Sequence, residues 1–354
     1  MELIKEFITR KAPHSHIDEV DFTKLEFGTY VSDHMVVCDF QEGTWQTPKI
    51  VPFANLSISP SALALHYGQT VFEGMKAFPT QDGRVNVFRI ERHYRRFVRS
   101  LERMCMEPVP EEIFTEGIRQ LVELDRQWVP REPGSALYIR PFMYASENRF
   151  RVKPADEYRF IIFTGPVPAL YPQPLRVKVE TDYIRAARGG TGFAKCGGNY
   201  GGSLLAFKQA RSEGYDQVLW TDAMENKYIE ELGMMNVMLV IDQKLVTPPV
   251  SDTILDGITR DSLLTLARDS GMVVEERKIS LDEIRSAFEA GTLTEAFGVG
   301  TAAVVSPIGV IGIGETDYTL PKYSHEHFSA RLKDKLERIR SGIEPDTYGW
   351  NSII

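Results

Sequence analysis

One lysine of this chain stands in a segment whose neighbours are almost all small. Lys195 lies in Ala-Lys-Cys-Gly-Gly-Asn-Tyr-Gly-Gly, shortly after a glycine cluster at 189–192. Glycines allow a backbone to approach a ligand closely. Two kinds of chemistry use such a lysine: a phosphate loop of the form G-x-x-x-x-G-K-[ST], or a Schiff base with a flat aldehyde cofactor. A solvated loop lysine is the plain alternative.

The phosphate-loop pattern fails at two of its four fixed positions. Counted from Gly189, Ala194 stands where the second glycine belongs, and Cys196 stands where the pattern needs Ser or Thr. The other interpretation, a pyridoxal phosphate site, needs an acid or base for the ring nitrogen, a phosphate cradle and a partner for the phenolic oxygen. Glu231 is a candidate for the ring nitrogen, because a carboxylate there keeps the pyridinium protonated and the ring able to accept electrons. A surface charge on a strand is the alternative for this residue.

Two small-residue turns are candidates for the phosphate cradle. Gly257-Ile258-Thr259 stands at an expected helix start, where unpaired N–H groups and the helix dipole favour an anion. The segment 298–303 is a second turn of this kind. An arginine of the basic helix would complete the cradle, but periodicity does not choose among four that all lie off its apolar stripe: Arg92, Arg95, Arg96 and Arg99.

Helical and strand periodicities alternate along both halves of the chain. In the first half we expect helices over 59–74 and 111–129, strands over 84–90 and 136–145, and a helix whose apolar stripe runs from Ile90 to Met104. The second half has expected strands near 217–221, 235–241 and 244–247, and helices through 210, from 257, over 281–290 and over 326–339.

A proline-rich segment divides the two halves. Gly165–Pro174 holds four prolines in ten residues, which continue neither a helix nor a central strand. We therefore expect an N-terminal domain over 1–166, a linker over 167–177 and a C-terminal domain over 178–354 that carries the lysine. The alternating elements predict two α/β or α+β domains with the site at their interface.

Composition limits the classes of function. The chain has 354 residues, 43% of them apolar, and a net charge of 41 − 49 = −8 with a pI near 5.5. These values argue against nucleic-acid binding and a polybasic membrane surface, and the longest apolar stretches are too short or broken to span a bilayer. The three cysteines show no C-x-x-C pair, so we expect a cytoplasmic protein and no metal site.

Seven motifs, in order along the chain, together resemble the branched-chain amino acid aminotransferases. These are fold-type IV pyridoxal-phosphate enzymes, and the chain looks more like their longer subgroup than like the shorter bacterial type. The motifs are HYGQTVFEGMKAF (66–78), FRIERHYRRF (88–97), YIRP (138–141), KCGGNYGG (195–202), EELGMMN (230–236), GITRD (257–261) and GTAAVVSP (300–307).

The resemblance implies a role for each matching residue. Lys195 would form the Schiff base and act as acid and base, Glu231 would pair with the ring nitrogen, and Tyr200 with the phenolic oxygen. The remaining cofactor contacts, mainly to phosphate, would come from Arg96, Arg185, Ile258, Thr259 and Thr301. The side-chain pocket would be lined by Phe27, Tyr67, Phe72 and Tyr138, and the substrate carboxylate held by the Thr301–Ala302 backbone with Tyr138.

The family also implies a homodimer in which sites borrow residues, Tyr67 among them, from the other subunit. It implies transfer of the amino group of leucine, isoleucine or valine to 2-oxoglutarate by a ping-pong mechanism. Two departures stand out: Met234 replaces a threonine of the animal members, and Ala303 and Ser306 replace their redox C-x-x-C. Rival interpretations are a D-amino acid aminotransferase, a chorismate-derived lyase, a P-loop nucleotide binder and a catalytically silent relative.

Arg140 is a candidate for binding the second carboxylate of glutamate, and this candidate follows from the residues themselves. A pocket lined by aromatic side chains cannot bury the second carboxylate of glutamate unless a cation or a hydroxyl group meets it. Residues two apart in a strand point to the same face, so a pocket that contains Tyr138 can also contain Arg140. The alternative is that Arg140 pairs with an acid and braces its strand.

Overall fold

The computed structural model describes residues 6–169 and 173–354, and its contacts divide the chain into two compact units. Of the described residues, unit 1 contains 6–169, Ala194–Gly198 and Ile339–Ile354, and unit 2 contains the others. The expected linker over 167–177 falls partly on residues 170–172, which lie outside the described residues. The domain limits 1–166 and 178–354 therefore stay a prediction.

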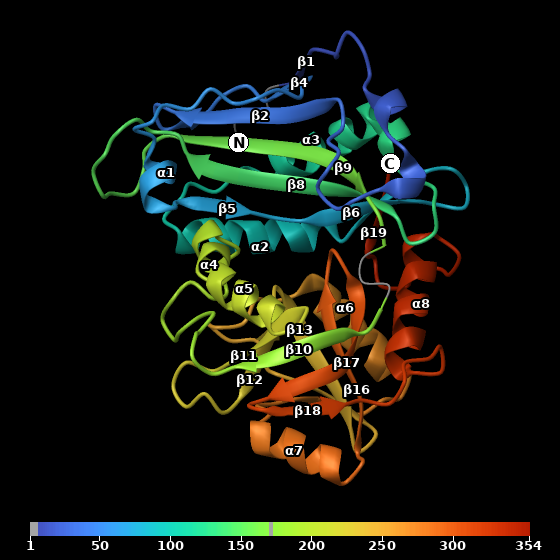
Figure 1. The fold of residues 1–354 in the computed structure, drawn as a ribbon. Helices are drawn as coiled ribbons and strands as arrows, with labels where there is room; N and C mark the ends of the chain where they lie inside the picture. Colours follow the sequence, from blue (N-terminus) through green and yellow to red (C-terminus); the bar gives the residue numbers. More distant parts are fainter. Residues whose placement is uncertain (1–5, 170–172) are drawn as a thin grey trace. The chain divides into compact units, whose positions relative to one another are not determined.

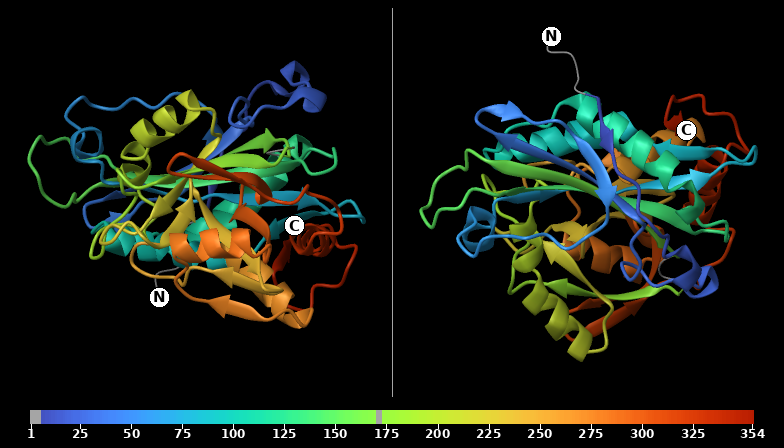
Figure 2. Two further views of the ribbon diagram at one scale, coloured as in Figure 1. Left: turned by 60° about the horizontal axis from the view of Figure 1, so that its bottom comes forward. Right: turned by 90° about the horizontal axis from the view of Figure 1, so that it is seen from above.

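Unit 1 is built on a ten-stranded sheet. Its strands follow the order β1-β4-β2-β9-β8-β6-β7-β19, with β3 beside β2 and β5 beside β8. The neighbouring strands β2, β9 and β8 are antiparallel and can be followed in Figures 1 and 2. The strands are β1 (Ile8–Thr9), β2 (His34–Gln41), β3 (Thr44–Trp45), β4 (Lys49–Pro52), β5 (Thr70–Phe72), β6 (Met75–Pro79), β7 (Val85–Phe88), β8 (Ala136–Ala145), β9 (Tyr158–Val167) and β19 (Asn351–Ile353).

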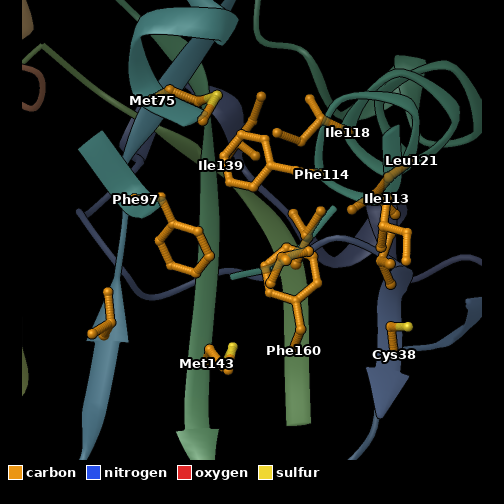
Figure 3. Close-up of a cluster of buried hydrophobic side chains, with 14 of the residues drawn as sticks. Cys38, Met75, Phe97, Ile113, Phe114, Ile118, Leu121, Ile139, Met143 and Phe160 are labelled. Carbon is orange, nitrogen blue, oxygen red and sulfur yellow. The ribbon is translucent and has the colours of Figure 1, made fainter. Parts of the chain in front are cut away.

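Two helices cover one face of this sheet. α2 (Ile90–Arg103) and α3 (Glu111–Leu124) bury Phe97 and Phe114 against Phe160 of β9, as Figure 3 shows. Along β8, Leu137, Ile139 and Met143 face this core with 0% exposure. Because side chains alternate along a strand, Tyr138 and Arg140 point to the opposite face. The short helix α1 (Leu63–Tyr67) also belongs to unit 1.

Unit 2 is built on a nine-stranded sheet in which six strands form a closed ring. The order is β12-β11-β10-β17-β16-β13-β14-β15, β18 pairs with β17, and β12 also pairs with β13. Closure removes the exposed edges that an open sheet would leave. The strands are β10 (Leu175–Glu180), β11 (Gln217–Thr221), β12 (Ile229–Leu232), β13 (Met235–Ile241), β14 (Lys244–Thr247), β15 (Val274–Glu276), β16 (Leu293–Gly300), β17 (Val304–Ile313) and β18 (Thr316–Thr319).

Helices of the second half include α5 (Leu204–Ser212), α6 (Ile258–Asp269) and α7 (Leu281–Glu289). α6 and α7 both pack against β16, and α5 packs against β11. Two more helices, α4 (Gly197–Gly201) and α8 (Phe328–Arg340), have residues in both units. In the part of the chain that the structure describes, no helix is long and apolar enough to cross a membrane. The mixture of helices and sheets in each unit agrees with the predicted α/β and α+β class.

The structure differs from the expected elements at two places in unit 1. The helix expected over 59–74 ends at Tyr67, because Gly68 adopts a left-handed conformation with a φ of 63°, and the residues after it form β5, which pairs with β8. The helix expected over 111–129 ends at Leu124 and is followed by a short 3-10 turn. In both cases buried apolar residues follow a short distance after the helix, Val71 after α1 and Trp128 and Val129 after α3, so the apolar pattern continues past its end.

Two segments that lie far along the chain pack within unit 1. The segment with Lys195 belongs to unit 1, because Phe72 of β5 donates its N–H to the Lys195 carbonyl and Val71 pairs with Cys196. The chain end belongs to unit 1 because β19 pairs with β7. Neither pairing is visible in local periodicity.

Candidate functional site

The backbone of Lys195 is fixed on both sides within unit 1. Its carbonyl accepts the Phe72 N–H at 3.0 Å, and its own N–H donates to the Ser100 hydroxyl of α2 at 3.0 Å. The Nζ atom lies 4.9 Å from the centre of the Phe72 ring. The next residue, Cys196, is buried and packs in the core, so it is not an exposed thiol. The lysine is thus half-buried and held in a defined position.

Arg96 is buried on α2 and paired with an acid that the sequence analysis did not identify. Its Nε lies 2.8 Å from Oε2 of Glu73, whose exposure is 0%. Burial by itself would raise the pKa of the Glu73 carboxyl, but the Arg96 guanidinium outweighs it and holds the pKa well below its usual range. Both groups therefore stay charged, and the acid fixes the direction of the guanidinium.

A histidine completes this cluster. His93 lies one turn before Arg96, 2% exposed, with Nδ1 3.3 Å from Oε1 of Glu73. Burial lowers the His93 pKa to about 4, against the opposing effect of Glu73. The imidazole is neutral at pH 7, so the net charge of the three side chains is zero. One feature of the sequence could have indicated Glu73: it stands next to Gly74 in a segment of mostly apolar residues.

Three aromatic side chains and one cationic side chain meet beside β8. The Phe27 and Tyr138 rings pack edge to face with 5.2 Å between their centres. The Arg140 guanidinium lies 5.0 Å from the centre of the Phe72 ring and 5.1 Å from that of Tyr138, and it donates to the Tyr138 hydroxyl at 3.2 Å. The structure thus brings Phe27, Phe72, Tyr138 and Arg140 together, and Arg140 does share a face with Tyr138.

Gly74 allows the Tyr138 hydroxyl to take this position. A Cβ built on Gly74 would lie 1.9 Å from that hydroxyl oxygen, so any side chain there would displace the ring. The close approach of backbone to phenol explains the glycine in the F-E-G motif.

Arg140 has no acid partner among residues 6–169 and 173–354. No carboxylate there lies within ion-pair distance of its guanidinium, and its Nε is buried without a hydrogen-bond partner. The structure therefore does not show the acid that the bracing alternative requires. Instead it leaves a half-buried cation with unused donor capacity next to two aromatic rings.

Tyr67 lies apart from the other aromatic residues of the predicted pocket. It is the last residue of α1, is 41% exposed, and its ring packs against that of His66. In the described part of the chain it makes no ring contact with Phe27, Phe72 or Tyr138. Unit 1 alone does not place it in the pocket.

In unit 2, Glu231 on β12 is a buried carboxylate with fixed partners. It is 3% exposed, its Oε1 accepts the Leu255 N–H at 2.6 Å, and its Oε2 lies 3.3 Å from Nε of Arg185. Arg185 in turn donates to the carbonyls of Gly192 and Thr253. This excludes the alternative of a solvated surface charge for Glu231.

The N-terminus of α6 is a buried helix start without a side-chain cap. Gly257 is the N-cap residue and Thr259 in the first turn is 3% exposed. The helix itself offers no acceptor to the first-turn N–H groups of Ile258 and Thr259. A buried end of this kind, with its positive dipole, favours an anion.

Asn236 on β13 connects Glu231 with this helix end. It pairs with Glu231 across the β12–β13 hairpin, and its Nδ2 donates to the Leu255 carbonyl at 2.9 Å. A Cβ on Gly257 would lie 1.9 Å from its Oδ1. Asn236 also pairs with Val299 of β16, directly before the turn that contains Thr301 and Ala302. The sequence analysis did not single out this residue.

The remaining predicted residue, Tyr200, lies half-buried on α4. The residue before it, Asn199, exchanges two hydrogen bonds with Thr191, at 2.7 and 2.8 Å. These bonds close the glycine-rich loop before the helix. Met234, by contrast, is 57% exposed at the β12–β13 turn, so it does not fill the core as Met235 and Met238 do.

A family profile described as amino-transferase class IV matches residues 70–311. This span contains Lys195, Glu231 and the first turn of α6. The chain belongs to the class IV aminotransferases. It is 44% identical to branched-chain-amino-acid transaminase 1 of Bacillus subtilis, over 98% of this chain and 99% of that protein. It is 43% identical to the branched-chain-amino-acid aminotransferase of Mycobacterium tuberculosis, over 92% and 90%.

Solved structures of this family share the fold. The branched-chain amino acid aminotransferase of Escherichia coli matches with a TM-score of 0.72 at 26% identity, covering 90% of this chain and 98% of that one. The T.th. branched-chain amino acid aminotransferase complexed with N-(5'-phosphopyridoxyl)-L-glutamate matches with a TM-score of 0.73 at 27% identity, covering 90% and 97%. The class IV aminotransferase has the fold-type IV architecture that its motifs implied.

Proposed function

We propose that this class IV aminotransferase moves the amino group of leucine, isoleucine or valine to 2-oxoglutarate, giving branched-chain 2-oxo acids and glutamate in a ping-pong reaction. The observation that carries the proposal is the similarity to the Bacillus subtilis transaminase along nearly the whole of both chains. The rival P-loop interpretation needs a pattern that the chain lacks, and a silent relative would not need a buried Glu231.

The residues present fit pyridoxal phosphate. The buried, uncapped start of α6 suits a phosphate, and Glu231 offers a buried carboxylate to a protonated ring nitrogen. The related T.th. enzyme has been solved with a phosphopyridoxyl group. When bound, the cofactor stabilises the negative charge that develops on the substrate Cα as its proton leaves.

The proposed roles divide proton transfer from anchoring. The Lys195 amine would hold the cofactor through its aldehyde carbon; once the substrate amine has displaced it, the freed amine would accept the proton from the substrate Cα and pass it to that former aldehyde carbon. Glu231 holds the proton on the ring nitrogen, and Tyr200 pairs with the phenolic oxygen. As the family resemblance implies, the phosphate would be held by Arg96, Arg185, Ile258, Thr259 and Thr301.

The pocket combines an apolar lining with one cation. Phe27, Phe72, Tyr138 and a partner subunit's copy of Tyr67 would surround the branched side chain, while the Thr301–Ala302 backbone and Tyr138 hold the α-carboxylate. Arg140 would meet the second carboxylate of glutamate or 2-oxoglutarate. Since its Nε has no partner among the described residues, binding that carboxylate would satisfy a buried donor.

We also propose a homodimer in the cytoplasm. The face of the unit 1 sheet opposite α2 and α3 carries an apolar cluster around Met35, Tyr144 and Ile161, with Phe142 and Phe163 packed against it. At its edge the Phe53 ring, which is 42% exposed, packs against Phe163 with 5.8 Å between the ring centres. Exposed apolar side chains beside such a cluster are typical of subunit interfaces.

The first experiment is a transamination assay with the purified protein and added pyridoxal phosphate. We expect leucine, isoleucine and valine to give glutamate from 2-oxoglutarate, together with a visible absorption band of the bound cofactor. Alanine and D-amino acids serve as control substrates. A preference for D-amino acids, or no absorption band after cofactor addition, would contradict the proposal. Light scattering would test the dimer.

A further inference from the structure

The segment between β1 and β2 forms a loop whose two ends are tied by Asp33 and His34. The Asp33 carboxylate accepts hydrogen bonds from the Ser15 hydroxyl at 2.6 Å and from the His16 N–H at 2.9 Å. The His34 Nε2 accepts the Ala12 N–H at 2.8 Å. Three positions at the start of the loop are therefore fastened to two adjacent residues at its end.

Both acceptors are themselves held by buried side chains. Asp33 also accepts the Trp128 indole N–H at 2.9 Å, and Nδ1 of His34 lies 2.6 Å from Oδ1 of Asp125. Because Nε2 accepts a backbone N–H, the ring proton must lie on Nδ1 and be donated to Asp125. None of these four residues is more than 7% exposed. They form a rigid anchor at the start of β2.

Asp33 is a strong acceptor because it stays ionised. Burial alone would raise the pKa of its carboxyl, but the hydrogen bonds from Ser15, His16 and Trp128 outweigh burial and lower the pKa. Hydrogen bonds to a charged acceptor are about twice as strong as neutral ones.

The interior of the loop contacts the core of unit 1 only in part: Ile17 and Val20 pack against it without being fully buried, and Ser32 exchanges two hydrogen bonds with Thr164 of β9. Its two 3-10 turns, Ile17–Glu19 and Phe22–Lys24, bury no residue. The loop touches the sheet at Gly165 of β9, where a Cβ would lie 2.2 Å from the Tyr30 carbonyl oxygen. Gly165 pairs with Tyr138 in the β8–β9 register, so the loop meets the sheet beside Tyr138. This position places the Phe27 ring against the Tyr138 ring.

We propose that Asp33 and His34 are positioning residues that close this loop and thereby hold Phe27 in the substrate side-chain pocket. The proposal rests on the proposed function, since the pocket role of Phe27 gives the closed loop its effect on catalysis. Without the tie, the loop gains conformational entropy and Phe27 no longer occupies one position. Binding of an apolar side chain weakens. Proton transfer is unaffected, because none of the proposed acid, base or cofactor residues lies in the loop.

The test compares Asp33→Ala with a matched control in the holoenzyme. The control Asp82→Ala removes a carboxylate that accepts hydrogen bonds from Thr80 and Arg84 in the β6–β7 turn, which carries no pocket residue. We expect Asp33→Ala to raise KM for leucine about tenfold, the factor that corresponds to one hydrogen bond to a charged group. We expect kcat to change by less than about twofold, and the control to leave both constants unchanged.

A double-mutant cycle shows whether Asp33 acts through Phe27. Phe27→Ala alone should raise KM for leucine, and adding Asp33→Ala to it should raise KM little further, because the pair shares one effect. Fully additive effects would overturn the proposal. If Asp33→Ala fails to fold, Ser15→Ala carries the same cycle, since it removes one tie from the loop side and leaves the buried acid in place.

Hydrogen exchange of the holoenzyme separates this proposal from the proposed function. We expect faster exchange of the amides in 17–29 in Asp33→Ala than in the wild type or the control. Unchanged exchange would show that Asp33 does not close the loop, and faster exchange with an unchanged KM would show that closure does not serve the pocket. Absence of transamination in the wild type would instead refute the proposed function.

Discussion

Replacing Arg140 by methionine removes a cation from between two aromatic rings and keeps a long apolar side chain. The guanidinium lies about equally far from the Phe72 and Tyr138 ring centres, at 5.0 and 5.1 Å, and has a buried Nε without a partner in the described part of the chain. Glutamate and 2-oxoglutarate bring a second carboxylate to this pocket, and leucine does not. The substitution should therefore separate the two half-reactions.

The expected magnitudes follow from these contacts. A hydrogen bond to a charged group contributes about 1.5–3 kcal/mol, so the glutamate half-reaction should slow by roughly 10- to 150-fold. The leucine half-reaction loses only the contact of the cation with the rings, about 0.5–1 kcal/mol or roughly two- to fivefold.

Single-turnover absorbance measurements with each amino acid decide this prediction. Arg285→Met is a matched control, because Arg285 pairs with Asp282 on the surface of α7 and should affect neither half-reaction. Equal losses with glutamate and leucine in Arg140→Met would mean that Arg140 supports the structure of the pocket and does not bind the second carboxylate. Other residues would then allow the pocket to accept both glutamate and leucine.

Four further outcomes follow from the site and from the charges around it. Lys195→Ala should abolish transamination and prevent borohydride from fixing the cofactor to the protein, and substantial activity without added amines would exclude Lys195 from proton transfer. Glu231→Gln should still bind the cofactor, shown by its absorption band, but lose much of kcat, because a neutral amide does not stabilise a pyridinium; an unchanged kcat would refute this role. Glu73→Gln should destabilise the protein by about 3–5 kcal/mol in urea unfolding, the cost of leaving the Arg96 charge buried without its acid; a loss below about 1 kcal/mol would show that water or another group replaces Glu73. Burial would raise the pKa of Asp222, but the backbone N–H groups of residues 224, 225, 227 and 228 outweigh it and lower the pKa below 3.8. Its stabilising effect is therefore present above pH 3.8 and disappears as the pH falls through the lowered value. Asp222→Asn should lose stability at pH 7 and show a weaker acid dependence, and equal acid unfolding curves would contradict this.

Local pattern determined many of the elements. The strands predicted over 136–145, 217–221, 235–241 and 244–247 have these limits in the structure. The helix with the apolar stripe from Ile90 is α2. These elements depend on alternation or on helical spacing within one segment, which residue types record directly. The motifs around Lys195, Glu231 and Gly257 likewise identified the family, since each is short and continuous in the chain.

Only the tertiary structure determined which of these residues are partners. Glu73 pairs with Arg96 from 23 residues away, and Asp125 holds His34 from 91 residues away. Periodicity placed Arg96 off the apolar stripe with three other arginines, and nothing local distinguished it from them. Arg140 could equally have faced an acid or a pair of rings. The physical reason is that a buried charge takes its partner from whatever the packing of distant strands and helices brings beside it, and this packing depends on the whole chain rather than on any one segment.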